Sequence, residues 1–213
     1  MSIAQKYHRE LVFLKKTGAV EYFTKRLPKF IKERLVPRQQ KPGRKHEMLR
    51  NFQERFGCTT LIETGTYLGD TTYALANRFR RIYSVELDPA LAKLAQKRFI
   101  KSPHITIYQG DSGKILPQIL QKISERCLFW LDSHYSEGIT ARGAIDTPIA
   151  DELTAIFSHP IKNHVVLIDD AREFNGTNGY PTIEKLEEYV RKENQNYIIE
   201  TEKDIIRIYP KDV

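Results

Sequence analysis

Apolar and polar residues follow one another along residues 58–209 in an order that predicts alternating strands and helices. Short apolar runs of strand length are each followed by a segment with apolar residues at helical spacing. The predicted strands are 58–63, 81–86, 105–109, 127–132, 164–169, 197–201 and 205–209. The predicted helices are 46–56, 70–80, 88–100, 112–124, 147–158 and 181–193. This alternation is typical of a doubly wound α/β domain.

The last two predicted strands are separated by only Glu202, Lys203 and Asp204. Three residues are too few for the crossover that parallel strands require, so we expect an antiparallel hairpin. The pattern therefore predicts a seven-stranded Rossmann-like sheet with a C-terminal antiparallel hairpin, formed by residues 46–213.

Residues 1–45 differ from this domain in charge and pattern. Residues 1–57 hold 15 Lys and Arg against 5 Asp and Glu, a balance of +10, whereas the remainder holds 19 against 22, a balance of −3. Helical spacing within 3–35 and a linker composition at 36–45 predict a basic helical extension or lid, residues 1–45. Its partner stays open: solvent alone, an acidic substrate, an anionic membrane surface contacted through residues 1–35, or nucleic acid.

The composition places the chain among ordinary globular proteins. No apolar run reaches the roughly 18–20 residues that cross a bilayer, and the first residues are too charged for a signal peptide. Cys58 and Cys127 each open an apolar run, so we expect buried free thiols in a reducing, cytoplasmic compartment. A homodimer is compatible with these numbers.

The carboxyl ends of parallel strands are where such sheets bind ligands, and here they carry glycines and acids. ETGTYLGD, residues 63–70, places Gly65 and Gly69 between a strand and a helix, which differs from the GxGxxG fingerprint. Glu86 ends the second strand about 20 residues later, where a carboxylate suits a ribose diol. Asp111 follows the third strand, where it suits an adenine amino group or, alternatively, a helix cap.

ETGTYLGD, VELD, QGDS and FWLD, in this order and with the terminal hairpin, resemble class I S-adenosylmethionine-dependent methyltransferases over about residues 46–210. The resemblance implies that Glu63 and Gly65 lie near the methionine part of the cofactor. It also implies that Glu86 binds the ribose hydroxyls and Asp111 the adenine side. The remaining residues of the expected cofactor site are Thr66, Tyr67, Gly69, Leu87, Ser112 and Asp132. Tyr67 departs from the small residue often found between the glycines.

Three carboxylates end the fourth and fifth predicted strands: Asp132 in FWLDSHY, and Asp169 and Asp170 in LIDDAREF. They are similar to the divalent-metal site of catechol-type, macrolide and aminocoumarin O-methyltransferases. The similarity implies bound Mg²⁺, with Mn²⁺ or Ca²⁺ as alternatives. A metal-free acidic site is the competing interpretation, because adjacent strand residues point to opposite faces and one aspartate could pair with Arg172.

His134 lies two residues after Asp132, and we expect these two to be the catalytic residues, with His134 as the base. The expected reaction is O-methylation of a small-molecule, sugar or natural-product hydroxyl. Three alternatives stay open: an RNA N-methyltransferase that uses the basic extension, an NAD-dependent oxidoreductase, and a non-catalytic nucleoside-binding module. The lack of an NPPY-type motif after the fourth strand counts against a base amine as acceptor, and the GxxxG loop counts against NAD.

Overall fold

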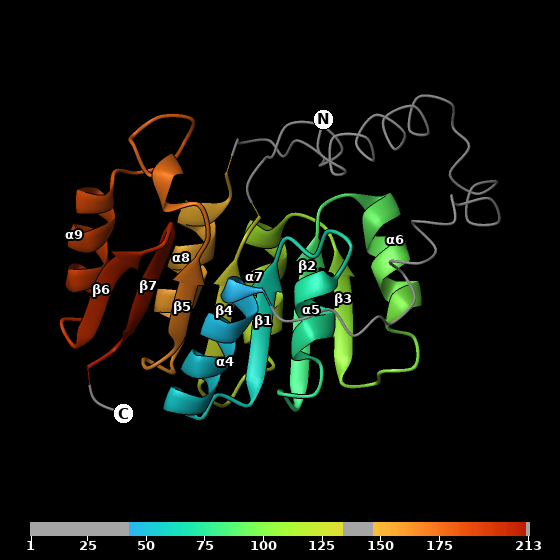
Figure 1. The fold of residues 1–213 in the computed structure, drawn as a ribbon. Coiled ribbons are helices and arrows are strands. Elements are labelled where there is room, and N and C mark those ends of the chain that lie inside the picture. Colours follow the sequence, from blue (N-terminus) through green and yellow to red (C-terminus); the bar gives the residue numbers. More distant parts are fainter. Residues whose placement is uncertain (1–42, 134–146, 212–213) are drawn as a thin grey trace.

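The computed structural model describes residues 43–133 and 147–211 of the chain (Figure 1). The predicted helices within 3–35 and the proposed base His134 lie outside these residues. Within the described part, no helix combines the length and the apolar composition needed to cross a bilayer. Cys58 and Cys127 are buried with free thiols, as the sequence predicts.

The described strands form one seven-stranded sheet in the order β3-β2-β1-β4-β5-β7-β6. Their bounds are β1 Thr60–Thr64, β2 Arg81–Glu86, β3 Ile105–Gln109, β4 Cys127–Leu131, β5 Val165–Ile168, β6 Tyr197–Glu202 and β7 Ile205–Pro210. Strands β1 to β5 are parallel to one another, whereas β7 runs antiparallel to both β5 and β6. The predicted Rossmann-like sheet with a terminal hairpin is therefore confirmed.

Helices cover both faces of the sheet (Figure 1). Their bounds are α4 Arg44–Phe56, α5 Asp70–Leu75, α6 Pro89–Arg98, α7 Ser112–Leu120, α8 Ile149–Ser158 and α9 Ile183–Glu193. One apolar cluster joins α4, α5 and α6 to one face, and a second joins α7, α8 and α9 to the other. The central strands are buried on both faces, which explains why their sequences are apolar without alternation.

Several element ends differ from the predicted ones for local reasons. Helix α5 ends at Leu75 rather than near 80, because Phe79 turns into the core and the Arg80 N–H donates to the Thr59 carbonyl. Helix α7 accommodates Pro117 but ends at Leu120. Helix α4 begins at Arg44 rather than 46, so Lys45, in the predicted linker, belongs to the helix that covers the sheet.

The hairpin between β6 and β7 turns through Lys203 and Asp204, both in the left-handed region with φ of 52° and 66°. The Asp204 carbonyl also accepts a hydrogen bond from the Ala171 N–H, at 2.9 Å. Because Ala171 follows the end of β5, this bond ties the hairpin turn to the carboxyl end of the sheet.

Candidate functional site

The strand order reverses between β1 and β4, and the ends of these two strands lie against each other. Thr64 and Leu131 are paired, so Gly65 and Asp132 follow at neighbouring positions. Gly65 has φ +89°, and a Cβ added to it would lie 2.7 Å from the Asp132 carbonyl carbon. Glycine is therefore required here, and the two strand ends meet where doubly wound sheets bind their ligands.

The loop after β1 is fastened to β2 by its own backbone. The N–H groups of Gly65 and Thr66 both donate to the Val85 carbonyl, at 2.9 and 3.1 Å. The hydroxyls of Thr66 and Ser84 lie 2.6 Å apart. Tyr67 has the left-handed φ of 49°, and its ring is more exposed than its neighbours. These bonds fix the loop backbone at one place, as a loop that approaches a ligand requires.

Glu63 lies beneath this loop, almost fully buried at the end of β1. Its Oε2 accepts hydrogen bonds from the hydroxyls of Thr72, at 2.5 Å, and Ser84, at 2.6 Å. Burial raises the pKa of Glu63 to about 7, against the lowering by these two hydroxyls. Glu63 thus connects β1, β2 and α5, and its contact with a methionine group stays a prediction.

Glu86 ends β2 and holds the turns on both sides of it. One carboxylate oxygen accepts from the Tyr67 N–H at 2.7 Å, and the other accepts from the Asp88 N–H at 2.9 Å. Asp88 in turn caps α6 through the Ala90 and Leu91 N–H groups. Glu86 therefore fixes the loop after β1 and the turn before α6, and its contact with a ribose stays a prediction.

Asp111 lies at the end of β3 and caps α7. Its Oδ1 accepts from the Gly113 N–H at 3.0 Å, and its other oxygen lies 3.3 Å from the Lys114 ammonium. The alternative role of Asp111 as a helix cap is therefore present in the structure. Its contact with adenine, like that of the neighbouring Ser112, stays a prediction.

Asp132 and Asp169 follow the paired residues Leu131 and Ile168 at the ends of β4 and β5. The Asp132 N–H donates to the Thr64 carbonyl and the Asp169 N–H to the Leu131 carbonyl, each at 3.0 Å. The backbone hydrogen bonds therefore continue one residue beyond the strands, and the two aspartates lie in one row with Gly65.

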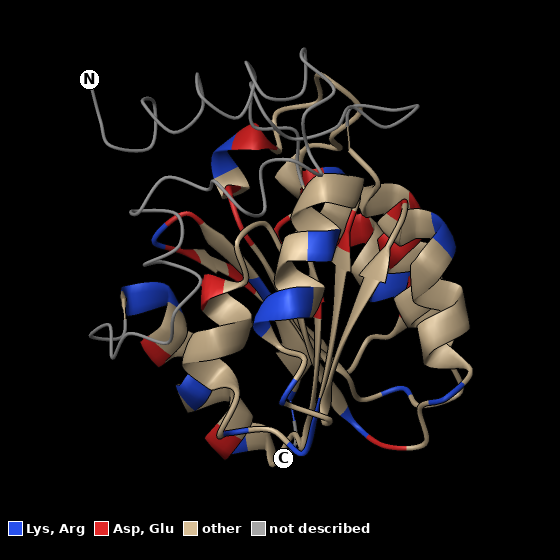
Figure 2. Ribbon diagram, turned by 90° about the vertical axis from the view of Figure 1, so that its right-hand side faces the viewer, with Lys and Arg blue, Asp and Glu red and all other residues tan. Residues whose placement is uncertain are grey.

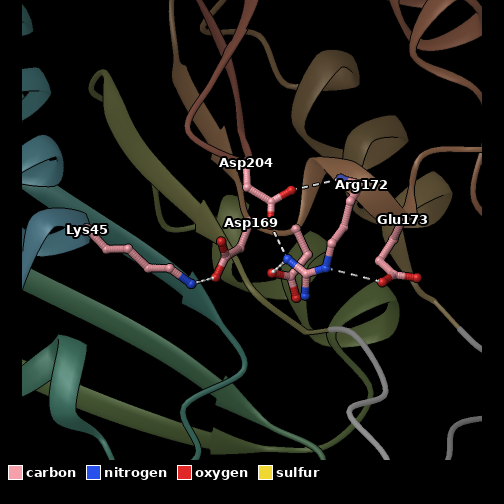
Figure 3. Close-up of polar contacts among 6 residues, drawn as sticks. Lys45, Asp169, Arg172, Glu173 and Asp204 are labelled. Atoms are coloured by element: carbon pink, nitrogen blue, oxygen red, sulfur yellow. Dashed lines mark hydrogen bonds and ion pairs between the residues drawn. The ribbon is translucent and has the colours of Figure 1, made fainter.

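Asp170 departs from this row because its backbone takes the left-handed φ of 54°. Its carboxylate lies 2.7 Å from the Arg172 guanidinium, which also pairs with Asp204 and Glu173 (Figure 3). Hydrogen bonding to Asp170 raises the pKa of Arg172. The structure thus contains the ion pair with Arg172 that is the alternative to metal binding.

Asp169 pairs with a cation from a different element. Lys45 of α4 extends across the Trp130 ring, 5.9 Å from its centroid, and its ammonium donates to Asp169 Oδ2 (Figure 3). Burial lowers the pKa of Lys45, but the hydrogen bond to Asp169 and the charges of Asp132 and Asp170 outweigh it and raise the pKa. Lys45 therefore carries its positive charge among the three aspartates.

The metal site inferred from Asp132, Asp169 and Asp170 does not fit this arrangement. Two of the three carboxylates already pair with Lys45 and Arg172. Among residues 43–133 and 147–211, no three His, Cys, Asp or Glu side chains are grouped as a metal ion requires. The described geometry thus gives no support to the expected Mg²⁺, Mn²⁺ or Ca²⁺.

At this end of the sheet the structure gathers the predicted residues Glu63, Gly65, Thr66, Tyr67, Gly69, Glu86, Leu87, Asp111, Ser112, Asp132, Asp169 and Asp170. Figure 2 shows acidic segments at the upper ends of strands in that view. The sequence patterns missed two further charged residues. Lys45 stands in a predicted linker, where no periodicity marks it. Glu152 lies on the apolar face of α8. A carboxylate among apolar residues at helical spacing can be recognised in the sequence, so Glu152 could have been found.

Glu152 is almost fully buried and accepts a hydrogen bond from the Ser133 hydroxyl at 2.7 Å. Burial raises its pKa, whereas the hydroxyls of Ser112, Ser133 and Thr64 lower it. Ser133 follows β4, and the second carboxylate oxygen of Glu152, Oε2, is buried without a hydrogen-bond partner. Glu152 of α8 is therefore hydrogen-bonded to the residue that follows Asp132 at the end of β4.

Comparisons with known proteins find methyltransferases whose names differ in what they methylate. The model of the ribosomal RNA adenine dimethylase family matches residues 51–130. A "Probable ribosomal RNA small subunit methyltransferase A" of Methanosarcina acetivorans is 39% identical over 56 residues, which are 26% of this chain and 21% of the relative. A "Ribosomal RNA small subunit methyltransferase A" of Acidobacterium capsulatum is 32% identical over 72 residues, 34% of this chain and 25% of the relative.

Solved structures match 80–91% of the chain at 11–15% sequence identity. The O-methyltransferase TomG of Streptomyces achromogenes, in complex with SAM, gives a TM-score of 0.58 at 13% identity, covering 91% of this chain and 96% of TomG. An O-methyltransferase of Bacillus cereus, in complex with SAH, gives 0.58 at 15% identity, covering 90% and 97%. A putative rRNA-methylase of Clostridium thermocellum gives 0.56 at 11% identity, covering 80% and 100%.

The chain has the class I methyltransferase fold. The family match runs from within α4 to within β4, the part that contains Gly65, Glu86 and Asp111. It ends at Trp130, before Asp132 and the two aspartates after β5. The similarity of sequence therefore covers the predicted cofactor side of the site, and the chain spans about a quarter or less of these two relatives.

Proposed function

We propose that this protein is an S-adenosylmethionine-dependent methyltransferase. The observation that carries the proposal is Glu86, held by the backbone of Tyr67 and Asp88 at the end of β2, beside a glycine loop in a class I methyltransferase fold. In the proposal Glu63, Gly65, Thr66, Tyr67 and Gly69 surround the methionine part. Glu86 and Leu87 bind the ribose, Asp111 and Ser112 face the adenine, and Asp132 closes the methionine side.

Methyl transfer needs little covalent chemistry from the protein. The methyl group is already activated by the positively charged sulfur, so the site has to align the nucleophile with the C–S bond. The close approach of Gly65 to Asp132 supports this function, because it brings the ends of β1 and β4 together. In the proposal the cofactor and the acceptor meet at these two strand ends.

RNA is the acceptor class that the comparisons favour, with an amine of a base as the methylated group. The matching family model and the two relatives carry ribosomal RNA in their names. The balance of +10 over residues 1–57 suits a polyanion. In this proposal a base of RNA replaces the small-molecule hydroxyl that the sequence motifs favour. We also propose a cytoplasmic location for the protein.

A hydroxyl group is the second candidate acceptor. The observation in its favour is the sequence after β4, Leu131-Asp132-Ser133, which lacks an NPPY-type motif. The family match stops just before it, at Trp130. In this candidate His134, outside the described residues, keeps its predicted role as the base.

Glu86→Ala tests the cofactor site. Removal of the carboxylate that binds the ribose should weaken the binding of S-adenosylmethionine by about 1.5–3 kcal/mol, the range for a hydrogen bond to a charged group. Isothermal calorimetry measures the affinity, with Glu54→Ala on the exposed face of α4 as the control. Equal affinity of Glu86→Ala and the wild type would refute the placement of the ribose, and no binding by the wild type would refute the proposed function.

The two acceptors are separated by methyl transfer from radiolabelled S-adenosylmethionine. One reaction contains an unmodified transcript of small-subunit ribosomal RNA, and the other contains an RNA-free extract of cell metabolites. Label in the transcript, recovered as methylated adenosine after nuclease digestion, supports the first candidate. Label only in a hydroxyl of an extracted metabolite supports the second.

A further inference from the structure

Lys45 takes the place at the acidic strand ends that a metal ion was expected to take. Its ammonium contacts Asp169 Oδ2, and it lies close enough to Asp132 and Asp170 for their charges to raise its pKa. The Lys45 side chain is half exposed, whereas that of Asp169 is only 2% exposed. The buried carboxylate is therefore neutralised by a lysine that reaches it from solvent.

The pair leaves one strong hydrogen-bond acceptor unused. Asp169 Oδ1 is buried and has no hydrogen-bond partner, although its sister oxygen is bound to Lys45. The indole Nε1 of Trp130, in the ring beneath Lys45, is likewise buried without a partner. A buried acceptor without a partner costs free energy unless a ligand supplies the donor. Asp169 follows Ile168, at the strand end next to Asp132, where the methyl acceptor must lie in the proposed function.

We propose that Lys45 is the resident cation of the acceptor site, and that it orients Asp169 so that Oδ1 accepts a hydrogen bond from the N–H group that receives the methyl. The proposal rests on the proposed function and specifies its acceptor chemistry. Asp169 is the catalytic residue, because it contacts the acceptor, and Lys45 is a positioning residue that acts through Asp169.

An amine suits this pair better than a hydroxyl. The nitrogen lone pair forms the bond to the methyl carbon, the C–S bond breaks, and its electron pair stays on sulfur as the thioether. The nitrogen then carries one proton too many, which passes to Asp169 Oδ1 and on to water. A hydroxyl has to give up its proton as it attacks, which demands a stronger base than a carboxylate already paired with an ammonium.

Binding of Mn²⁺ to the full chain, followed by electron paramagnetic resonance, tests whether Lys45 replaces a metal. The wild type and Asp169→Asn should bind Mn²⁺ equally weakly. Lys45→Met should bind it at least about tenfold more tightly, because the carboxylates lose their own cation. Tight binding by the wild type that Asp169→Asn abolishes would overturn the proposal in favour of a metal site.

Single-turnover methylation of the ribosomal RNA transcript tests the role of the pair. Asp169→Asn should lower the rate by roughly 10²–10⁴-fold, the contribution of a positioned proton acceptor. Lys45→Met should lower it by roughly 10–100-fold through misplacement of Asp169, and Lys45→Arg should restore most of the loss. The double variant Lys45→Met with Asp169→Asn buries no unpaired charge. It should fold and be no slower than Asp169→Asn alone.

Three controls keep the outcomes distinct. Lys185→Met, on the exposed face of α9, should leave every rate unchanged. Affinity for S-adenosylmethionine should be kept in all variants, so its absence in the wild type refutes the proposed function rather than the ion pair. Chelator should leave the wild-type rate unchanged. Loss of turnover with chelator and recovery with Mg²⁺, or a full rate in Lys45→Met, would overturn the role of Lys45.

Discussion

Single carboxylates at the strand ends differ in the groups that surround them. Glu86 accepts hydrogen bonds from two backbone N–H groups. Glu63 is buried among hydroxyls, and its pKa rises to about 7. Asp169 is neutralised by Lys45. Carboxylates at equivalent strand ends therefore hold two turns, connect buried hydroxyls and form an ion pair.

The raised pKa of Glu63 determines how the free energy of unfolding changes with pH. Its pKa is higher in the folded protein than the usual 4.5, so between pH 4.5 and 7 the unfolded chain loses the proton and the folded chain keeps it. The contribution of Glu63 to the free energy of unfolding is complete below pH 4.5 and is lost as the pH rises through 7. For such a shift in pKa the loss is roughly 3 kcal/mol. Glu63→Gln should therefore gain stability over the wild type as the pH rises.

Urea unfolding of both proteins at pH 5 and pH 8 measures this difference. The stability of Glu63→Gln relative to the wild type should increase between the two values, whereas Glu54→Gln, at an exposed site on α4, should show no such change. Parallel pH profiles of Glu63→Gln and the wild type would show that Glu63 has an ordinary pKa in the folded state.

At the scale of elements, the contact of the β1 and β4 ends is the tightest part of the site. Gly65→Ala adds a Cβ against the Asp132 carbonyl, which is backbone and cannot turn aside. We expect a loss of at least about 3 kcal/mol of stability, since both overpacking and the left-handed backbone contribute. The variant should also lose its affinity for S-adenosylmethionine, because the loop after β1 has to move.

Gly57→Ala is the matched control for this prediction. Gly57 ends α4 in the same left-handed region, with φ +61°, but an added Cβ meets nothing within 4 Å. It should cost only about 1–2 kcal/mol for the backbone conformation and should leave cofactor affinity intact. Urea unfolding and calorimetry compare the two variants, and equal effects would show that the β1–β4 contact is not limiting.

For the whole molecule, charge is divided along the chain, with +10 over residues 1–57 and −3 over the rest. If RNA is the acceptor, the basic segment should bind its phosphates. Changing Lys15, Lys16, Lys25 and Arg26 to Gln in the full chain should then weaken RNA binding. The slope of log affinity against log salt should become shallower by about 0.7 for every phosphate of a single strand that the protein no longer neutralises.

Binding of the same ribosomal RNA transcript over a series of salt concentrations measures the slope. Four surface residues of the acidic part, Lys185, Arg191, Lys192 and Lys203, changed to Gln, form the matched control and should leave the slope unchanged. Affinity for S-adenosylmethionine should be the same in all three proteins. Equal slopes in both quadruple variants would place the RNA contacts elsewhere or remove RNA as the acceptor.

The sequence by itself determined the order of the strands and helices and the identity of the residues at the strand ends. This is possible because burial on both faces imposes continuous apolar runs, and one-sided burial imposes helical spacing. Since parallel strands all end at one edge, the same pattern placed Glu63, Glu86, Asp111, Asp132 and Asp169 at one end of the sheet. The antiparallel hairpin followed from a gap too short for a crossover.

Only the tertiary structure decided what each of these side chains contacts. Lys45 and Asp169 are 124 positions apart in the sequence, and they meet because α4 packs over the face of the sheet that contains Trp130. The aspartates after β5 separate because Asp170 turns into the left-handed region. Local periodicity carries no information about such partners, since they depend on how distant elements pack. Two of the three carboxylates that resemble a metal site in the sequence are thus paired with the protein's own cations in the fold.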